Sequence, residues 1–208
     1  MRHLTALLVF GLLGETAANG QVLITGEPGG SGAQAVVATA NLISVKDFGT
    51  LKNFWGQYGY GLTSRVDIFA VYGAITVFGK TQQYIGGGSN IGILQRGRHG
   101  LDVSFFSNVS VPMTRRDEAA TLLGTFAFVA SRPVKIGSLP VTPYGGFEAV
   151  VPVGHRARGV FTPVETLPAA ILGVAIALNK TWAAFAEYDP GPTLRSGGVG
   201  IAVIIPRQ

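Results

Sequence analysis

Four acidic residues stand alone inside otherwise apolar stretches of the sequence. Asp67, Asp102, Glu148 and Glu187 have mostly β-branched, aromatic, glycine or alanine neighbours. Placing an isolated charge in apolar surroundings is costly, so such side chains need either a partner of opposite charge or a polar interior. Two kinds of chemistry fit them, namely a structural set of ion pairs and the charged lining of a passage.

Basic residues that can pair with these acids lie in nearby short connections. Asp67 and Asp102 are close enough in sequence to such connections to meet their cations, and Arg65 is the nearest to Asp67. The candidate bases are Arg65, Arg96, Arg98, Arg132, Lys135 and Lys180. We therefore predict an interior lined by Arg65, Asp67, Asp102, Asn108, Glu148 and Glu187, as an ion-pair plug or as a narrow pore.

The sequence gives little support for catalysis, metal binding or cofactor binding. Beyond the first residues, the histidines are His99 and His155, and neither belongs to a recognisable catalytic or metal-binding motif. The run at 86–90 (GGGSN) lacks the Lys-Ser/Thr pair that follows a phosphate-binding loop. We expect no enzyme activity, no metal and no cofactor.

The N-terminus has the three-part pattern of a secretory signal peptide. Residues 1–3 are basic, residues 4–13 are apolar, and residues 14–18 are small and weakly polar. The apolar run is too short for a membrane-spanning helix, which needs about 20 residues. We assign residues 1–18 to a signal peptide, 19–32 to a flexible Gly/Pro-rich leader, and 33–206 to one β-barrel domain.

The composition is that of a hydrophobic protein without a long apolar helix. Hydrophobic residues are 47% of the chain and charged residues only 13%, with 30 glycines and no cysteine. The charged share is about half that of a soluble domain. The net charge is +5, but the cations are scattered, so nucleic-acid binding is not expected.

The chain repeats one theme, a stretch rich in β-branched, aromatic and glycine residues followed by a turn signal. Most of the stretches have about 10 to 14 residues, which suits a tilted strand crossing a bilayer. The expected strands are 33–46, 50–61, 65–79, 84–96, 99–111, 118–131, 139–152, 165–178, 181–189 and 196–206. Tight connections alternate with longer or more polar ones, and an even number of strands places both termini beside the tight turns, as in outer-membrane barrels.

Alternation within these segments predicts one large apolar face and one small or polar face. In segment 99–111, Leu101, Val103 and Phe105 alternate with Asp102 and Ser104. A membrane barrel needs apolar residues facing lipid and polar ones facing the lumen. A soluble barrel would carry many charges on its outer face, and too few exist here. We predict a closed antiparallel up-and-down transmembrane barrel of about ten strands, with eight or twelve possible.

Residues 58–69 (YGYGLTSRVDIF) carry a family resemblance. Tyr60, Gly61, Leu62 and Thr63, followed by Arg65 and Asp67, resemble a hairpin common in bacterial outer-membrane β-barrels. The resemblance implies an exported protein of the bacterial outer membrane whose partners are its lipids and its insertion machinery. The chain departs from the family at its end (IPRQ), where an aromatic residue is common.

The implied function is a structural or narrow-pore barrel of unspecified substrate. The alternatives are a soluble secreted or periplasmic β-barrel that binds an apolar ligand and, third, a lipid-modifying barrel enzyme. In the predicted longest outer loop, 154–164, Arg156 and Arg158 are candidates for contact with lipopolysaccharide phosphates, because arginine binds phosphate through two parallel hydrogen bonds.

Overall fold

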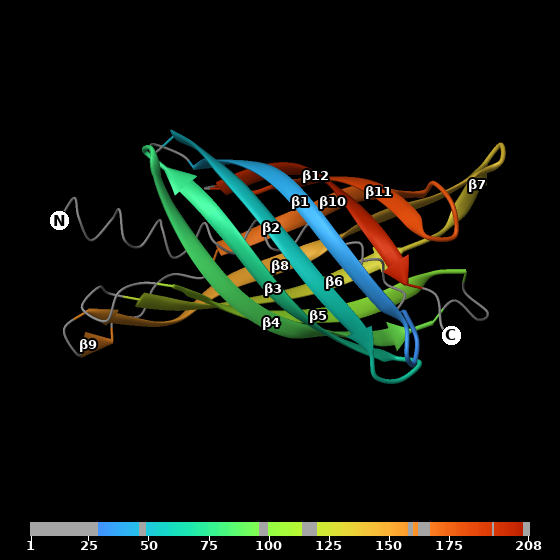
Figure 1. The fold of residues 1–208 in the computed structure, drawn as a ribbon, viewed down its shortest axis with the longest axis horizontal. Coiled ribbons are helices and arrows are strands. Elements are labelled where there is room, and N and C mark those ends of the chain that lie inside the picture. The colour runs from blue at the N-terminus through green and yellow to red at the C-terminus, as the bar shows by residue number, and fades with distance from the viewer. Residues whose placement is uncertain are drawn as a thin grey trace.

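The computed structural model describes residues 29–45, 49–95, 100–113, 120–157, 160–161, 167–192 and 194–205. Regular structure in these ranges consists of β-strands (Figure 1). The strands are β1 (Gln34–Val45), β2 (Gly49–Gly61), β3 (Val66–Val77), β4 (Lys80–Leu94), β5 (Asp102–Pro112), β6 (Ala120–Ser131), β7 (Val134–Ile136), β8 (Leu139–Ala157), β9 (Val160–Phe161), β10 (Leu167–Ala177), β11 (Trp182–Pro190) and β12 (Leu194–Ile205).

Ten of these strands close into an antiparallel barrel. Each long strand pairs with its neighbour in sequence, β8 pairs with β10, and β1 pairs with β12 from Gln34↔Ile205 to Val45↔Leu194. The strands are tilted relative to the long axis, as closure of a sheet requires (Figure 1). The predicted fold class is therefore confirmed, with the predicted strand number.

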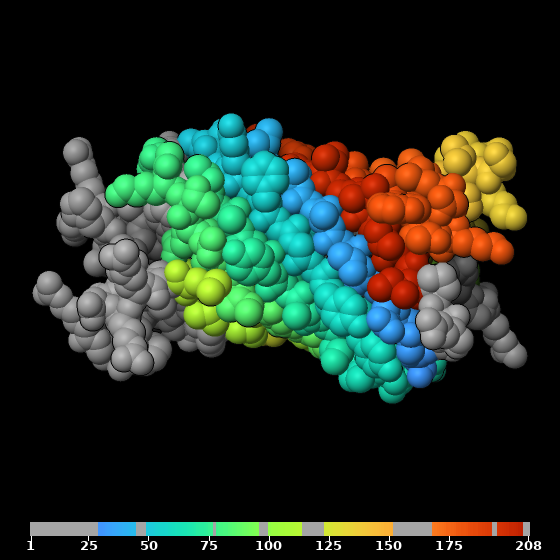
Figure 2. Space-filling model, in the orientation of Figure 1, coloured from blue at the N-terminus to red at the C-terminus, as the bar shows by residue number. Residues whose placement is uncertain are grey.

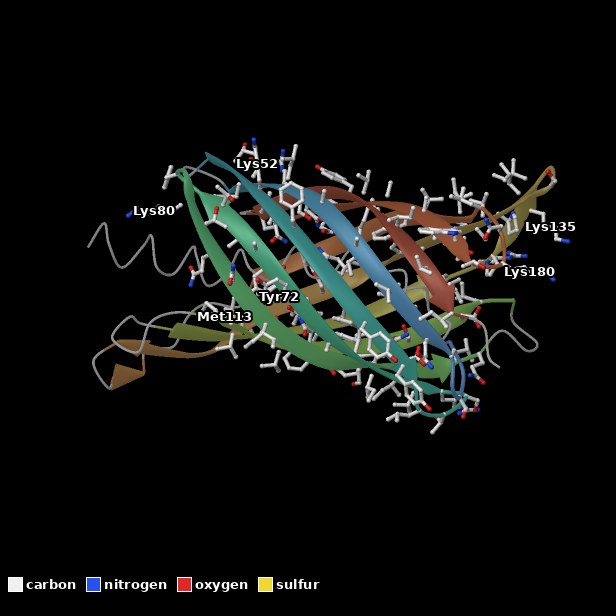
Figure 3. The ribbon with its side chains drawn as sticks, in the orientation of Figure 1. Lys52, Tyr72, Lys80, Met113, Lys135 and Lys180 are labelled. Atoms are coloured by element: carbon white, nitrogen blue, oxygen red, sulfur yellow. The ribbon has the colours of Figure 1, made fainter. Side chains whose placement is uncertain are left out.

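The barrel has two unlike ends. The end that we call the turn end carries the connections 62–65, 132–138 and 178–181, and the first described residues lie there because Gln34 pairs with Ile205. The opposite end, which we call the loop end, carries the tight turn at Phe78 and Gly79 and the connections that contain residues 46–48, 114–119 and 158–166. Lys80 marks the loop end in Figure 3, and Lys135 and Lys180 mark the turn end.

Residues 80–83, expected as a connection, instead begin β4, and the tight turn lies at Phe78 and Gly79. Two further connections also differ from those expected. The segment 132–138, expected as a turn, contains β7, which pairs with the first residues of β8 and extends the sheet beyond the turn end (Figure 1). The expected loop 154–164 is partly strand, because β8 continues to Ala157 and pairs with β9. In both places residues with β propensity continue the pairing beyond the barrel wall, because an antiparallel ladder can extend without closing.

Large apolar side chains cover the outside of the barrel. Side chains alternate across a strand, so every second residue faces outward. Val109 is 41% exposed, Leu172 55%, Val199 62% and Phe147 75%. Exposed aromatic residues on five strands add to this surface, namely Phe54, Tyr58, Tyr60, Tyr72, Phe126, Phe128, Phe147, Trp182 and Tyr188. An apolar outer face of this extent is what contact with lipid requires.

The inner face is more apolar than the sequence predicted. The alternation predicted a lumen face of Gly, Ala, Ser and Asn, and Ser104, Asn108, Thr125 and Ala202 do point inward and are buried. Large side chains share this face and form a buried cluster that includes Ile43, Trp55, Phe69, Tyr84, Phe106 and Ile171. These residues interdigitate with the small ones, which leaves room for both in a narrow barrel.

No helix long and apolar enough to cross a bilayer occurs in the ranges that the structure describes.

Candidate functional site: the acidic wall of the lumen

Charge is sorted by sign between the inside and the outside of the barrel. Every Asp and Glu side chain that the structure describes is buried, and every described Lys and Arg side chain is exposed. The acids are Asp67, Asp102, Glu148, Glu187 and Asp189. The cations are Lys52, Arg65, Lys80, Arg132, Lys135, Lys180 and Arg195. The lumen is therefore acidic along the described strands, and the cations lie on the outer surface and at the ends.

Three of these acids gather on one side of the lumen, which we call the acidic wall: Glu148, Glu187 and Asp189. Glu148 lies on β8, and Glu187 and Asp189 lie two residues apart on β11, so both face inward. They are 3%, 6% and 1% exposed, respectively. Strand β10 lies between β8 and β11, and its small residues Ala169 and Gly173 stand opposite Glu148 and Glu187.

Tyr144 of β8 links this strand to β11 across the acidic wall. Its hydroxyl donates a hydrogen bond to Oε2 of Glu187 at 2.9 Å. The ring reaches Glu187 by lying across Gly173, where an added Cβ would collide with the ring and hydroxyl of Tyr144. Gly173 pairs with Tyr144 on one side and with Glu187 on the other. The absence of a side chain at this position is therefore what permits the contact.

Asp189 is likewise held by a neutral group. Asp189 Oδ2 accepts a hydrogen bond from the hydroxyl of Ser196, its pairing partner on β12. Oε1 of Glu187 and Oδ1 of Asp189 are buried and have no hydrogen-bond partner among the described residues. Carboxyl groups held by hydroxyls in a dry interior are positioned to attract a cation.

The predicted site residues are only partly brought together. Asp67 is at the turn end, where its Oδ2 accepts the backbone N–H of Gly29 at 2.8 Å. Asp102 is buried at the start of β5, and Asn108, farther along that strand, donates to Ser110 Oγ at 3.2 Å. Glu148 and Glu187 belong to the acidic wall. Arg65 is exposed in the turn 62–65, so it does not line the lumen.

Two of the acids have neutral partners in place of the cations that we predicted. Asp67 is held by a backbone amide and Glu187 by a tyrosine hydroxyl. Arg65 is close to Asp67 in sequence but does not point into the lumen. Residues 62–65 connect β2 and β3 at the turn end, and Arg65 is exposed there. Where the interior is filled, the filling consists of aromatic and aliphatic side chains together with hydrogen-bonded acids.

Two residues of this site were not predicted. Asp189 follows Glu187 by two positions, so alternation alone places it on the same face, but its position next to Pro190 suggested the end of a strand. Tyr144 carries no charge, and its role depends on the register between β8 and β10, which the sequence does not predict. The pattern of a lone glycine opposite a tyrosine becomes visible only once the register is known.

Several predicted positions lie outside the described residues. These are the proposed signal peptide 1–18, most of the leader 19–32, the candidate bases Arg96 and Arg98, His99 and Arg158. Residues 29–32 of the leader form a turn in which Gly32 N–H donates to Gly61 O at 2.7 Å. Arg156 lies in β8, opposite Ala120 and Phe161, instead of in a loop, and His155 lies next to it in the same strand.

The described part of the chain offers no metal centre. No group of three or more His, Cys, Asp or Glu residues with suitable geometry for a metal ion occurs in it.

Comparison with known proteins rests on structure alone. No protein-family model matches the chain, and no curated protein matches it. The COG4313 outer membrane channel from Pseudomonas putida F1 is similar, with 8% identity, a TM-score of 0.55, and coverage of 86% of this chain and 97% of that one. The chain has the fold of the bacterial outer-membrane β-barrels.

Two further barrels match over most of their length. The translocator domain of the autotransporter NalP from Neisseria meningitidis is 12% identical, with a TM-score of 0.48 and coverage of 97% and 96% of the two chains. The N-terminal β-barrel domain of Pseudomonas aeruginosa OprF is 12% identical, with a TM-score of 0.38 and coverage of 85% and 99%. At these identities, the likeness of an outer-membrane barrel to its neighbours concerns the fold and not the activity.

Proposed function

We propose that this protein is an outer-membrane β-barrel with a structural, non-enzymatic role, whose lumen is closed by its own side chains. The apolar outer face and the fold of its structural neighbours support the membrane location. In such barrels the termini and short turns lie in the periplasm, so the turn end is periplasmic and the loop end faces outward. Export through the N-terminal segment is part of the same proposal, and the insertion machinery is the expected partner.

The observation that carries the proposal is the burial of lumen side chains from around the whole barrel. Ile43 of β1, Asn53 of β2, Phe106 of β5, Val129 of β6 and Ile171 of β10 are all 0% exposed. A barrel of this strand number is narrow enough for side chains to fill it. Inward residues without contact to water on so many strands support a barrel that does not conduct ions in this conformation.

A narrow cation-selective pore is the second candidate, and the acidic wall is the observation that favours it. Fixed carboxyl groups along a constriction attract cations and exclude anions. Rearrangement of Tyr144 would open space beside Glu187 and Asp189, because its ring is what crosses the wall at Gly173. The two candidates share the same location and differ only in whether the lumen opens.

A soluble periplasmic barrel with an apolar ligand is less well supported. Such a protein would turn its large apolar residues inward and cover its outside with charges. The described strands have the opposite distribution of charge, with no exposed Asp or Glu side chain among them. Cell fractionation tests this point, since we expect the protein in the detergent-extracted envelope. Recovery in the aqueous periplasmic fraction would contradict the proposal.

Conductance across a planar bilayer distinguishes a closed barrel from a pore. We expect purified protein that is inserted and heat-modifiable on gels to give no steady channel current. A steady cation-selective current that Glu187→Gln reduces would favour the pore. Lys180→Gln, which changes an exposed cation at the turn end, is the matched control and should leave any current unchanged.

A further inference from the structure

A groove on the outside of the barrel crosses strands β12, β1 and β2, which lie side by side in Figure 2 as red, blue and cyan bands. It has a volume of about 350 Å³. Its lining includes Ala40 and Leu42 of β1, Lys52 and Phe54 of β2, and Gly197 and Val199 of β12. This volume is in the range of small-molecule sites.

The shape of the groove follows from small residues set among large ones. Leu42, Phe54 and Val199 are 58%, 59% and 62% exposed, so they stand up from the barrel surface. Gly197 pairs with Leu42 and with Tyr188, and a Cβ built at Gly197 would come no nearer than 3.9 Å to Tyr188 and 4.0 Å to the Glu187 carbonyl oxygen. Gly197 therefore leaves a depression that faces the membrane.

Two cations lie at the mouth of the groove, towards the loop end. Lys52 lines the groove directly opposite Leu42 and is exposed (Figure 3). Arg195 is exposed on the same outward face, two residues before Gly197 on β12 and opposite Ser44. A lysine ammonium and an arginine guanidinium are both suited to phosphate, the arginine through two parallel hydrogen bonds.

We propose that this groove binds one acyl chain of lipopolysaccharide, with Lys52 and Arg195 contacting a phosphate of its lipid A. An apolar groove whose charged groups are confined to one end matches a lipid with an apolar tail and an anionic head. A second copy of this chain fits less well, because a symmetric contact brings like charges together. The inference rests on the proposed function, which turns the loop end towards the lipopolysaccharide leaflet.

The test measures lipid binding to the detergent-purified full chain by native mass spectrometry. The probes are bisphosphorylated lipid A, phosphatidylglycerol and phosphatidylethanolamine. We expect lipid A to bind at least about tenfold more tightly than phosphatidylethanolamine, the size of effect that a hydrogen bond to a charged group supports. Equal affinity for phosphatidylglycerol and lipid A would overturn the assignment to lipopolysaccharide.

Two substitutions separate the head-group contact from the groove. Lys52→Gln should weaken lipid A binding about tenfold and leave phosphatidylethanolamine unchanged. Gly197→Leu fills the depression and should weaken both lipids. The matched controls are Lys80→Gln, an exposed cation outside the lining, and Ala70→Leu, an outward position on β3. Both should bind lipid A as the unaltered protein does.

The inference and the proposed function fail in different ways. Lipid A affinity within twofold of the unaltered protein in both Lys52→Gln and Gly197→Leu would overturn the groove while leaving the membrane location intact. Because Lys52 is exposed, Lys52→Gln remains informative if Gly197→Leu does not fold. A chain found in the aqueous fraction of cells would instead overturn the proposed function.

Discussion

The same arrangement of tyrosine and glycine occurs on two walls of the lumen with different polar partners. On one wall Tyr84 lies across Gly73, and its hydroxyl is 3.3 Å from both Oδ1 and Nδ2 of Asn53. On the acidic wall Tyr144 lies across Gly173 and donates to Glu187 at 2.9 Å. The first wall, which we call the aromatic wall, is formed by Trp55, Phe69, Tyr84 and Phe106, all of them buried.

The comparison separates the geometry of the lumen from its chemistry. Glycine provides the space in both walls, and the aromatic ring fills it. The polar group that the tyrosine hydroxyl meets then sets the chemistry of the wall. An amide is neutral and carries both donors and an acceptor, whereas a carboxyl group in a dry interior needs hydrogen-bond donors from its neighbours. We infer that the aromatic wall stabilises the barrel and that the acidic wall is where any function of the lumen resides.

Truncating the aromatic wall should have the largest effect. Phe106 is fully buried and stacks on Phe69 with ring centroids 5.0 Å apart and planes within 4°. Phe106→Ala removes this packing and should lower the free energy of unfolding by about 3–5 kcal/mol. Urea unfolding in detergent micelles measures it, with the outward-facing Phe147→Ala, a residue that is 75% exposed, as control. Equal losses in the two variants would contradict a packed lumen.

Adding a methyl group at either glycine should have the next largest effect. Gly73→Ala and Gly173→Ala each force a tyrosine ring to move, because the new Cβ would overlap it. We expect each to lower the free energy of unfolding by about 1–3 kcal/mol, the usual range for overpacking. The control is Ala70→Ser at an exposed, outward position on β3. Another glycine, Gly49, is unsuitable because alanine would be strained at its backbone φ of +113°. An unchanged midpoint in both glycine variants would mean that the rings do not occupy these positions.

Removing the two tyrosine hydroxyls should sharpen the difference between the walls. Tyr144→Phe leaves the buried Glu187 carboxyl group without its only described donor and should cost about 1–3 kcal/mol. Tyr84→Phe removes a longer contact to an amide and should cost about 0.5–1.5 kcal/mol. The same unfolding measurement compares them. A larger loss in Tyr84→Phe would reverse the assignment of roles.

Neutralising the acidic wall should have the smallest effect on stability. Glu187→Gln keeps an acceptor for Tyr144 and removes a carboxyl group that is buried near Asp189. We expect the free energy of unfolding to stay constant or rise by up to about 1 kcal/mol, because the amide is cheaper to bury. Asn53→Asp is the reverse experiment on the aromatic wall and should destabilise. A clear loss in Glu187→Gln would show that the carboxyl group itself holds the wall together.

The sequence predicts most of the barrel and only part of its interior. Strand positions follow from a period of two and from turn residues, and both are local, which is why segment 99–111 corresponds to β5 at Asp102–Pro112. The inward direction of Asp67, Asp102, Asn108, Glu148 and Glu187 follows from the same alternation. The short strands β7 and β9 are formed by pairing with the ends of β8, and local patterns do not show such pairing. The sequence therefore predicted a turn and a loop at these positions.

The contacts of the lumen depend on the register between neighbouring strands, which local patterns do not predict. Tyr144 and Glu187 are separated by 43 residues and meet because Gly173 of β10 pairs with both. The large apolar residues inside are a related case, since Ile43 and Ile171 look like lipid-facing residues when size alone is considered. Phe106 differs, because the alternation in segment 99–111 already places it on the face of Asp102 and Ser104. A charged side chain predicts the face of a strand better than a large apolar one does. Charge is excluded from the lipid-facing side, whereas large apolar side chains occur on both the lipid-facing and the lumen-facing side.

Labelling of single cysteines tests the central account most directly, because the chain has no cysteine of its own. Asn108 and Val109 are adjacent on β5, with Asn108 1% exposed inside and Val109 41% exposed outside. In bilayer-inserted protein, we predict that Val109→Cys reacts with a membrane-soluble maleimide and that Asn108→Cys resists a charged, water-soluble methanethiosulfonate. Rapid reaction of Asn108→Cys with the charged reagent would contradict a closed lumen, and failure of Val109→Cys to react with the membrane-soluble reagent would contradict its contact with lipid.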